Sequence, residues 1–149
     1  KKPRILMEPG RSIVADAGMT LYTVGTVKQI TNFKNYVAID GGMADNPRFA
    51  LYDAEYTVVT ANKAALPKHY RCTLVGKCCE SGDIIQEDIH IAKPEKGDII
   101  AVFTTGAYNY SMASNYNRIA KPPVVMLSGG KDYVAVRRET PEDIIRNDV

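Results

Sequence analysis

The stretch YTVGTVKQI at residues 22–30, followed by the turn TNFKN at residues 31–35 and the run YVAID at residues 36–40, decides the fold of this chain. Residues that favour strands, β-branched and aromatic, fill both runs, so the pattern predicts an antiparallel hairpin. Further strands are predicted at residues 55–60, 70–76 and 98–104, a last hairpin at residues 124–127 and 133–137, and short helices at residues 107–114 and at the C-terminus. Many short strands at this spacing indicate a mainly β domain, either a β-sandwich or a β-barrel.

The first twenty residues differ from the rest. The run ILM at residues 5–7 is short and fully apolar, which is typical of a strand buried on both faces of a parallel sheet. A Pro-Gly pair ends this strand, and Ser12 begins a predicted helix that ends near residue 20. A parallel strand needs neighbours, and no second strand–helix unit follows. We therefore expect residues 1–20 to be the remnant of such a unit, cut from a longer protein, and residues 21–149 to form the β domain.

Composition disfavours several classes of function. The chain has 149 residues, of which 45% are hydrophobic, so it can bury one core. Nineteen basic and seventeen acidic side chains leave a net charge of +2, and no basic run is interleaved with aromatic residues, so we expect no nucleic-acid partner. We also expect no membrane association, because no apolar stretch is long enough to span a bilayer and no signal peptide is recognisable. The predicted location is the cytoplasm.

The three cysteines predict neither a disulfide framework nor a metal site. Their number is odd, and Cys78 and Cys79 are adjacent. A metal site would have to use these two with Cys72, His69 and His90, but neighbouring residues of a strand point to opposite faces and no C-x2-C pair exists. We expect no bound metal.

Two short segments have side chains suited to chemistry. In CESGD at residues 79–83, Cys79 can donate a proton near neutral pH, and the adjacent Glu80 can hold an ammonium group. EPGR at residues 8–11 lies between a predicted strand and a predicted helix, where backbone N–H groups can hold a phosphate and Arg11 adds further donors. The alternative for EPGR is an ordinary turn with a surface arginine.

Two further positions could bind a ligand. Arg48 and Tyr52 are four residues apart, so one helical turn would place a guanidinium group and a phenol on the same side as a clamp for a carboxylate. Tyr108, after two small residues, could stack on a ring or bind a phosphate. The alternatives are a solvated arginine beside a half-buried tyrosine, and a core tyrosine.

Taken in order, five segments of this chain resemble the C-terminal part of the diaminopimelate decarboxylases, a family of pyridoxal-phosphate enzymes of lysine synthesis. The segments are EPGRSIV (8–14), GGMADNPRFALY (41–52), CESGD (79–83), GAY (106–108) and SMASNYN (111–117). In that family an N-terminal (β/α)8 barrel carries the Schiff-base lysine, a C-terminal β domain packs beside it, and the active site forms between the subunits of a homodimer. The resemblance implies that this chain supplies the last βα unit of the barrel and most of the β domain.

The resemblance also implies roles for individual residues. Those bordering pyridoxal 5'-phosphate would be Glu8, Pro9, Gly10, Arg11 and Tyr108. Those holding the amino-acid substrate would be Arg11, Arg48 and Tyr52 at a carboxylate, Glu80 at the distal amino group, and Tyr108. Cys79 would be catalytic, in the neighbouring subunit's site, and the additional Cys78 would be structural.

The implied reaction converts meso-2,6-diaminopimelate to L-lysine and CO2. The Schiff-base lysine and most of the barrel are absent, so we expect the chain alone to be inactive. One alternative is a related decarboxylase of the ornithine, arginine or carboxynorspermidine type, although two arginines and a tyrosine suit a distal carboxylate that ornithine lacks. Another is a non-enzymatic, dimerising β domain, which would have no need of Cys79 or Glu80.

Overall fold

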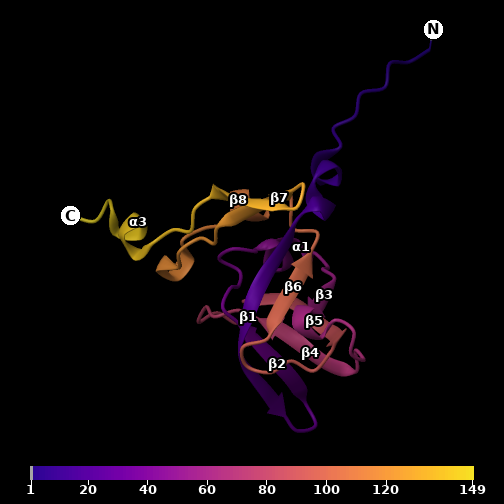
Figure 1. Ribbon diagram of the computed structural model, residues 1–149, viewed down its shortest axis with the longest axis vertical. Coiled ribbons are helices and arrows are strands. Elements are labelled where there is room, and N and C mark those ends of the chain that lie inside the picture. The colour runs from indigo at the N-terminus through magenta and orange to yellow at the C-terminus, as the bar shows by residue number, and fades with distance from the viewer. Residues whose placement is uncertain (1) are drawn as a thin grey trace.

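Six strands form the main sheet, in the order β3-β6-β1-β2-β4-β5 (Figure 1). The computed structural model describes residues 2–149 and gives the strands as β1 (Met19–Ile30), β2 (Lys34–Ile39), β3 (Val58–Thr60), β4 (Tyr70–Val75), β5 (Ile84–Ile91) and β6 (Ile99–Phe103). Neighbouring strands are antiparallel except β2 and β4, which are parallel. The predicted mainly β fold class is confirmed.

The predicted hairpin is β1 and β2, which pair from Ile30↔Lys34 to Val24↔Ile39. The register shifts between Val24 and Thr26, so β1 contains a bulge there. On the N-terminal side of this bulge β1 pairs with β6 instead, through residues 19–23. One long strand therefore joins the two halves of the sheet.

The core lies inside the curved sheet, where alternate side chains of the strands point inward. Five strands contribute apolar side chains that are at most 1% exposed: Val24, Val37, Leu74, Ile85 and Ile100. Each such side chain stabilises the fold by about 1.5–3 kcal/mol relative to an exposed one. These residues hold the sheet that supports the loops described below.

The two edge strands, β3 and β5, lie near each other, so the sheet is almost a closed barrel. Side chains connect the two sides of the gap. The backbone N–H of Tyr56, just before β3, donates to Oε1 of Gln86 on β5 at 2.8 Å, and the Thr60 hydroxyl donates to the carbonyl of Ala92 at 2.7 Å. Both bonds are buried, and they replace part of the missing backbone ladder.

A second hairpin and several short helices complete the chain. The hairpin consists of β7 (Val124–Ser128) and β8 (Lys131–Val136), as predicted, and it lies beyond one end of the barrel (Figure 1). The short helices are α1 (Arg48–Tyr52), α2 (Asn109–Met112) and α3 (Pro141–Ile145). In the part of the chain that the structure describes, none of the helices has the length and apolar character needed to cross a membrane.

The prediction for the start of the chain was wrong in its local elements. Residues 5–7 form no strand and are about 80% exposed. A strand is stable only with hydrogen-bonded neighbours, and residues 2–149 supply none for this segment. In place of the helix over residues 12–20 there are two 3₁₀ turns, η1 (Gly10–Ile13) and η2 (Ala15–Ala17), after which β1 begins. The proposed domain boundary near residue 21 stays a prediction.

We predict that Gly106→Ala destabilises the chain by about 1–3 kcal/mol, the usual cost of inserting an atom into a packed site. The backbone N–H of Gly106 donates to the Ala15 carbonyl at 2.9 Å, and a Cβ on Gly106 would collide with the Val14 carbonyl oxygen. Thermal unfolding followed by circular dichroism measures the effect. Gly82→Ala is the control, because a Cβ there would meet no atom within 4 Å. Equal melting temperatures for the two variants would contradict the prediction.

Candidate active site

Arg48, at the start of α1, lies beside two of the predicted ligand-binding tyrosines. Its guanidinium carbon is 5.3 Å from the centre of the Tyr52 ring and 5.6 Å from that of the Tyr108 ring. Nη1 donates a weak hydrogen bond to the sulfur of Met112 at 3.7 Å. Among the ion pairs of residues 2–149, none includes Arg48. A half-buried guanidinium group without a carboxylate partner is well suited to bind a carboxylate.

A buried polar network fixes the position of Arg48 relative to Tyr108. The Tyr56 hydroxyl donates to Oδ1 of Asn46 at 3.1 Å, and Nδ2 of Asn109 donates to the Tyr56 hydroxyl oxygen at 3.4 Å. Asn46 lies two residues before Arg48, and Asn109 directly follows Tyr108. The network therefore links the loop before α1 to the start of α2.

Gly10 and Tyr108, both predicted to border the cofactor, approach each other in the structure. Gly10 has φ = +57°, which glycine adopts without strain, and Tyr108 has φ = +69°, which is unusual for a side chain of its size. A Cβ at Gly10 would lie only 3.3 Å from the Tyr108 hydroxyl oxygen. Gly10 and Tyr108 thus approach each other in space, although almost a hundred residues separate them in the sequence.

All four residues of the 8–11 segment are exposed, Gly10 included. Glu8 and Pro9 precede η1, and the carbonyl of Pro9 accepts the Ser12 hydroxyl at 2.7 Å. The Arg11 side chain is also exposed, and no polar contact within residues 2–149 joins it to Arg48. The structure therefore brings together Gly10, Tyr108, Arg48 and Tyr52, and leaves Glu8, Pro9 and Arg11 open to solvent.

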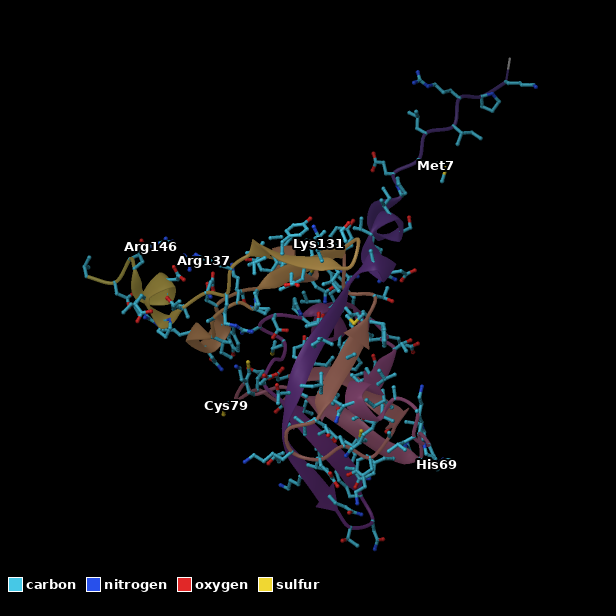
Figure 2. The ribbon with its side chains drawn as sticks, viewed as in Figure 1. Met7, His69, Cys79, Lys131, Arg137 and Arg146 are labelled. Atoms are coloured by element: carbon cyan, nitrogen blue, oxygen red, sulfur yellow. The ribbon has the colours of Figure 1, made fainter. Side chains whose placement is uncertain are left out.

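Cys79 and Glu80 lie in the loop between β4 and β5, and both are exposed. Figure 2 shows Cys79 at the edge of the sheet domain opposite His69. The Tyr116 hydroxyl donates to Oε2 of Glu80 at 2.9 Å. Because of this bond to a carboxylate, the pKa of Tyr116 is raised. Tyr116 belongs to one of the five segments, but its sequence neighbours predict no role for it.

Asp83, for which the sequence predicts no role, joins this loop to the loop at residues 40–47 before α1, called the glycine-rich loop below. Its carboxylate is 3% exposed and accepts the backbone N–H groups of Met43 and Cys78, each at 2.6 Å. A Cβ at either Gly42 or Gly76 would collide with that carboxylate. Gly42, Gly76 and Asp83 are all visible in the sequence, but their spacing alone does not predict that they contact one another; the fold brings them together.

Asp45 also stabilises the glycine-rich loop, through two hydrogen bonds. Its carboxylate accepts the Tyr22 hydroxyl at 2.5 Å and the Gly42 N–H at 2.8 Å. Burial raises the pKa of Asp45, and burial together with the charge of Asp45 raises the pKa of Tyr22 well above its ordinary value. The phenol therefore stays protonated and acts as the donor in this bond.

Among the described residues, no three His, Cys, Asp or Glu side chains are placed to hold a metal ion. The absence of bound metal stays a prediction.

Comparison with known proteins agrees with this geometry. Residues 12–106 match the family described as pyridoxal-dependent decarboxylase, C-terminal sheet domain. The chain belongs to this family. It is 51% identical over 147 residues to a diaminopimelate decarboxylase of Bacillus subtilis, covering 99% of this chain and 34% of the relative. The chain thus spans about a third of the length of the curated relatives it matches.

The solved structures that resemble this chain are also decarboxylases. The diaminopimelate decarboxylase of M. jannaschii in complex with L-lysine is similar with a TM-score of 0.89 and 36% identity, over 99% of this chain and 33% of that one. The lysine/ornithine decarboxylase of Vibrio vulnificus in complex with cadaverine is less similar, with a TM-score of 0.64 and 28% identity, over 74% of this chain and 30% of that one.

We predict that the three thiols react in the order of their exposure, with Cys79 first. Cys72 is 1% exposed, and burial raises its pKa to about 12, which leaves about one thiol in ten thousand ionised at pH 8. Burial and the nearby Asp83 charge raise the pKa of the half-buried Cys78. Iodoacetamide labelling followed by peptide mass spectrometry should show Cys79, then Cys78, and Cys72 only after unfolding. Labelling of Cys72 in the folded chain would contradict the assignment.

Proposed function

We propose that this chain is the C-terminal third of a pyridoxal-phosphate-dependent decarboxylase that converts meso-2,6-diaminopimelate to L-lysine and CO2. The supporting observation is Arg48, a half-buried cation that has no carboxylate partner among residues 2–149 and lies next to the rings of Tyr52 and Tyr108. A diaminopimelate molecule has a second carboxylate that such a group can bind. The greater similarity to diaminopimelate decarboxylases than to the lysine/ornithine enzyme favours this substrate over ornithine.

The residues near Gly10 fit one wall of a cofactor site. Gly10 leaves a space that a Cβ would fill against the Tyr108 hydroxyl group, and Arg11 is free in solvent close by. Glu8, Pro9 and Gly10 would border the phosphate, and Arg11 would add donors for it or for a substrate carboxylate. When bound, pyridoxal phosphate supplies the electron sink for cleavage of the bond to the departing carboxylate.

The other roles follow from position and chemistry. Arg48 and Tyr52 would bind the distal carboxylate, and Glu80 the distal amino group. Cys79 would deliver the proton that replaces CO2. Asp83 joins the Cys79 loop to the loop before Arg48, but Cys79 itself is exposed and has no polar contact with Arg48 among residues 2–149, which agrees with a Cys79 that acts in the site of a second subunit. We therefore propose a cytoplasmic homodimer.

The chain alone should not decarboxylate diaminopimelate, because the cofactor-binding lysine belongs to the barrel. The experiments below therefore use the whole protein that contains this chain. Release of CO2 and formation of L-lysine, dependent on pyridoxal phosphate, test the proposed reaction directly. A whole protein that prefers ornithine would overturn the proposed substrate.

We predict that Arg48→Ala lowers kcat/KM for diaminopimelate about 10- to 100-fold, as expected for loss of a hydrogen bond to a charged group. The loss should be much smaller for an analogue that lacks the distal carboxylate. Arg71→Ala is the matched control, since Arg71 is exposed on β4 and paired with Asp88 at 3.1 Å. Equal losses for both substrates would show that Arg48 holds a group that the two substrates share.

We predict that Cys79→Ala lowers kcat by about 100-fold or more, the usual effect of removing a positioned acid. Mixing this variant with one that lacks the cofactor-binding lysine should restore part of the activity, because mixed dimers would contain one intact site. Cys78→Ser, which changes the adjacent thiol, should keep most of the activity. If subunits exchange and activity is not restored, Cys79 does not act across the interface.

A further inference from the structure

Among residues 2–149, Tyr116 is the one residue whose side chain forms a hydrogen bond with the Glu80 carboxylate. The 2.9 Å bond uses only one carboxylate oxygen, Oε2, and within residues 2–149 the other oxygen, Oε1, has no hydrogen-bond partner. A carboxylate held at one oxygen has a fixed orientation and keeps a second acceptor for a ligand. In this bond the phenol donates and the carboxylate accepts.

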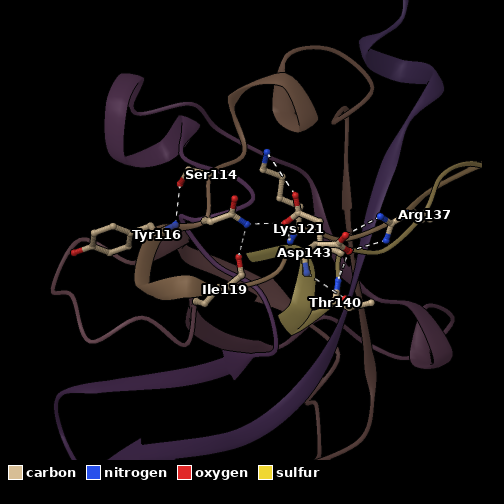
Figure 3. A network of polar contacts seen from close by, with 9 residues as sticks. Ser114, Tyr116, Ile119, Lys121, Arg137, Thr140 and Asp143 are labelled. Carbon is tan, nitrogen blue, oxygen red and sulfur yellow. Dashed lines mark hydrogen bonds and ion pairs between the residues drawn. The ribbon is translucent and has the colours of Figure 1, made fainter. Parts of the chain in front are cut away.

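The turn that positions Tyr116 is itself anchored to two other parts of the fold, the glycine-rich loop and residues 137–143. Figure 3 shows the polar contacts with residues 137–143. The Ser114 N–H donates to the Ala44 carbonyl at 2.8 Å, in the glycine-rich loop, and Oγ of Ser114 accepts the Tyr116 N–H at 3.3 Å. Nδ2 of Asn115 donates to Oε2 of Glu139 at 2.6 Å. Tyr116 is therefore fixed from both of its N-terminal neighbours.

The same turn is fixed on its C-terminal side. Asn117 and Arg118 have φ values of +53° and +54°, a region that a long side chain such as arginine rarely adopts. The strained turn is held by the bond from the Lys121 N–H to Glu139 at 2.9 Å and by an ion pair between Arg118 and Asp148. Strain of this kind persists only where the surrounding structure imposes it, and it is concentrated at functional sites.

We infer that Tyr116 is a positioning residue of the proposed decarboxylase site, whose hydroxyl group orients the Glu80 carboxylate toward the distal amino group of the substrate. This inference rests on the proposed function. It adds a specificity role for Tyr116, because only a substrate with an amino group at the distal centre uses the held carboxylate. On the open surface such a bond has little energetic effect, but a second subunit that covers it would strengthen it.

The test is Tyr116→Phe in the whole protein, which removes the hydroxyl group and keeps the ring. For meso-2,6-diaminopimelate we expect kcat/KM to fall about 5- to 20-fold, mainly through KM. The loss is smaller than for a direct hydrogen bond to the substrate, because Tyr116 only orients the group that binds it. For 2-aminopimelate, which lacks the distal amino group, the change should be below about twofold. If 2-aminopimelate is not turned over, its inhibition constant gives the same comparison.

Two further variants isolate the contact. Tyr110→Phe is the control, because Tyr110 is an exposed tyrosine on α2 whose hydroxyl group forms no hydrogen bond among the described residues. In a Glu80→Ala background, Tyr116→Phe should have almost no additional effect, since the group that it orients is gone. Thermal unfolding of each variant checks that the fold is kept.

The outcomes separate the two claims. A wild-type whole protein without activity on diaminopimelate would overturn the proposed function and this inference with it. An active wild type would overturn the inference alone if Tyr116→Phe had no effect, if it reduced both substrates equally, or if its effect were additive with that of Glu80→Ala.

Discussion

The buried carboxylate of Asp83 holds together the two loops on which the candidate active site depends. It accepts two backbone N–H groups at 2.6 Å, one from Met43 and one from Cys78, and only glycine fits beside it at Gly42 and Gly76. A charged acceptor that is bound twice and nearly excluded from water is costly to leave without its donors. The loop with the proposed acid and the loop before the proposed carboxylate clamp are therefore positioned by one side chain.

Local sequence was sufficient to predict most of the strands and insufficient to predict how the loops meet. The β1–β2 hairpin and β7–β8 have β-branched residues on both sides of clear turns, so pattern and structure agree. Strand β5 was missed, because IIQEDIHI has three consecutive polar residues in its middle and its burial does not alternate. Asp88, with φ = +51°, distorts that strand where the pairing with β4 shifts register. A bulge of this kind hides the alternation that identifies a strand.

The site residues show the same division. The side-chain chemistry of Arg48, Tyr52, Cys79 and Glu80 is visible in the sequence, and the first two lie on one helical turn as their spacing predicts. Tyr116 could not be connected to Glu80 from the sequence, because the contact spans 36 residues and depends on a turn with two left-handed residues. The chemistry of most candidate site residues can thus be predicted from the sequence, whereas the contacts that position them can be seen only in the folded chain.

The gap between β3 and β5 has a consequence for how the domain avoids the addition of a strand from another chain at the edges of its sheet. Two edge strands with free backbone groups would be a template on which a second chain could add a strand. Here β3 has only three residues, and Gln86 and Thr60 occupy backbone groups across the gap. The side-chain bonds across the gap let the sheet keep two short, irregular edge strands that a fully closed barrel would not have. These edges still present few free backbone groups to a strand of another chain.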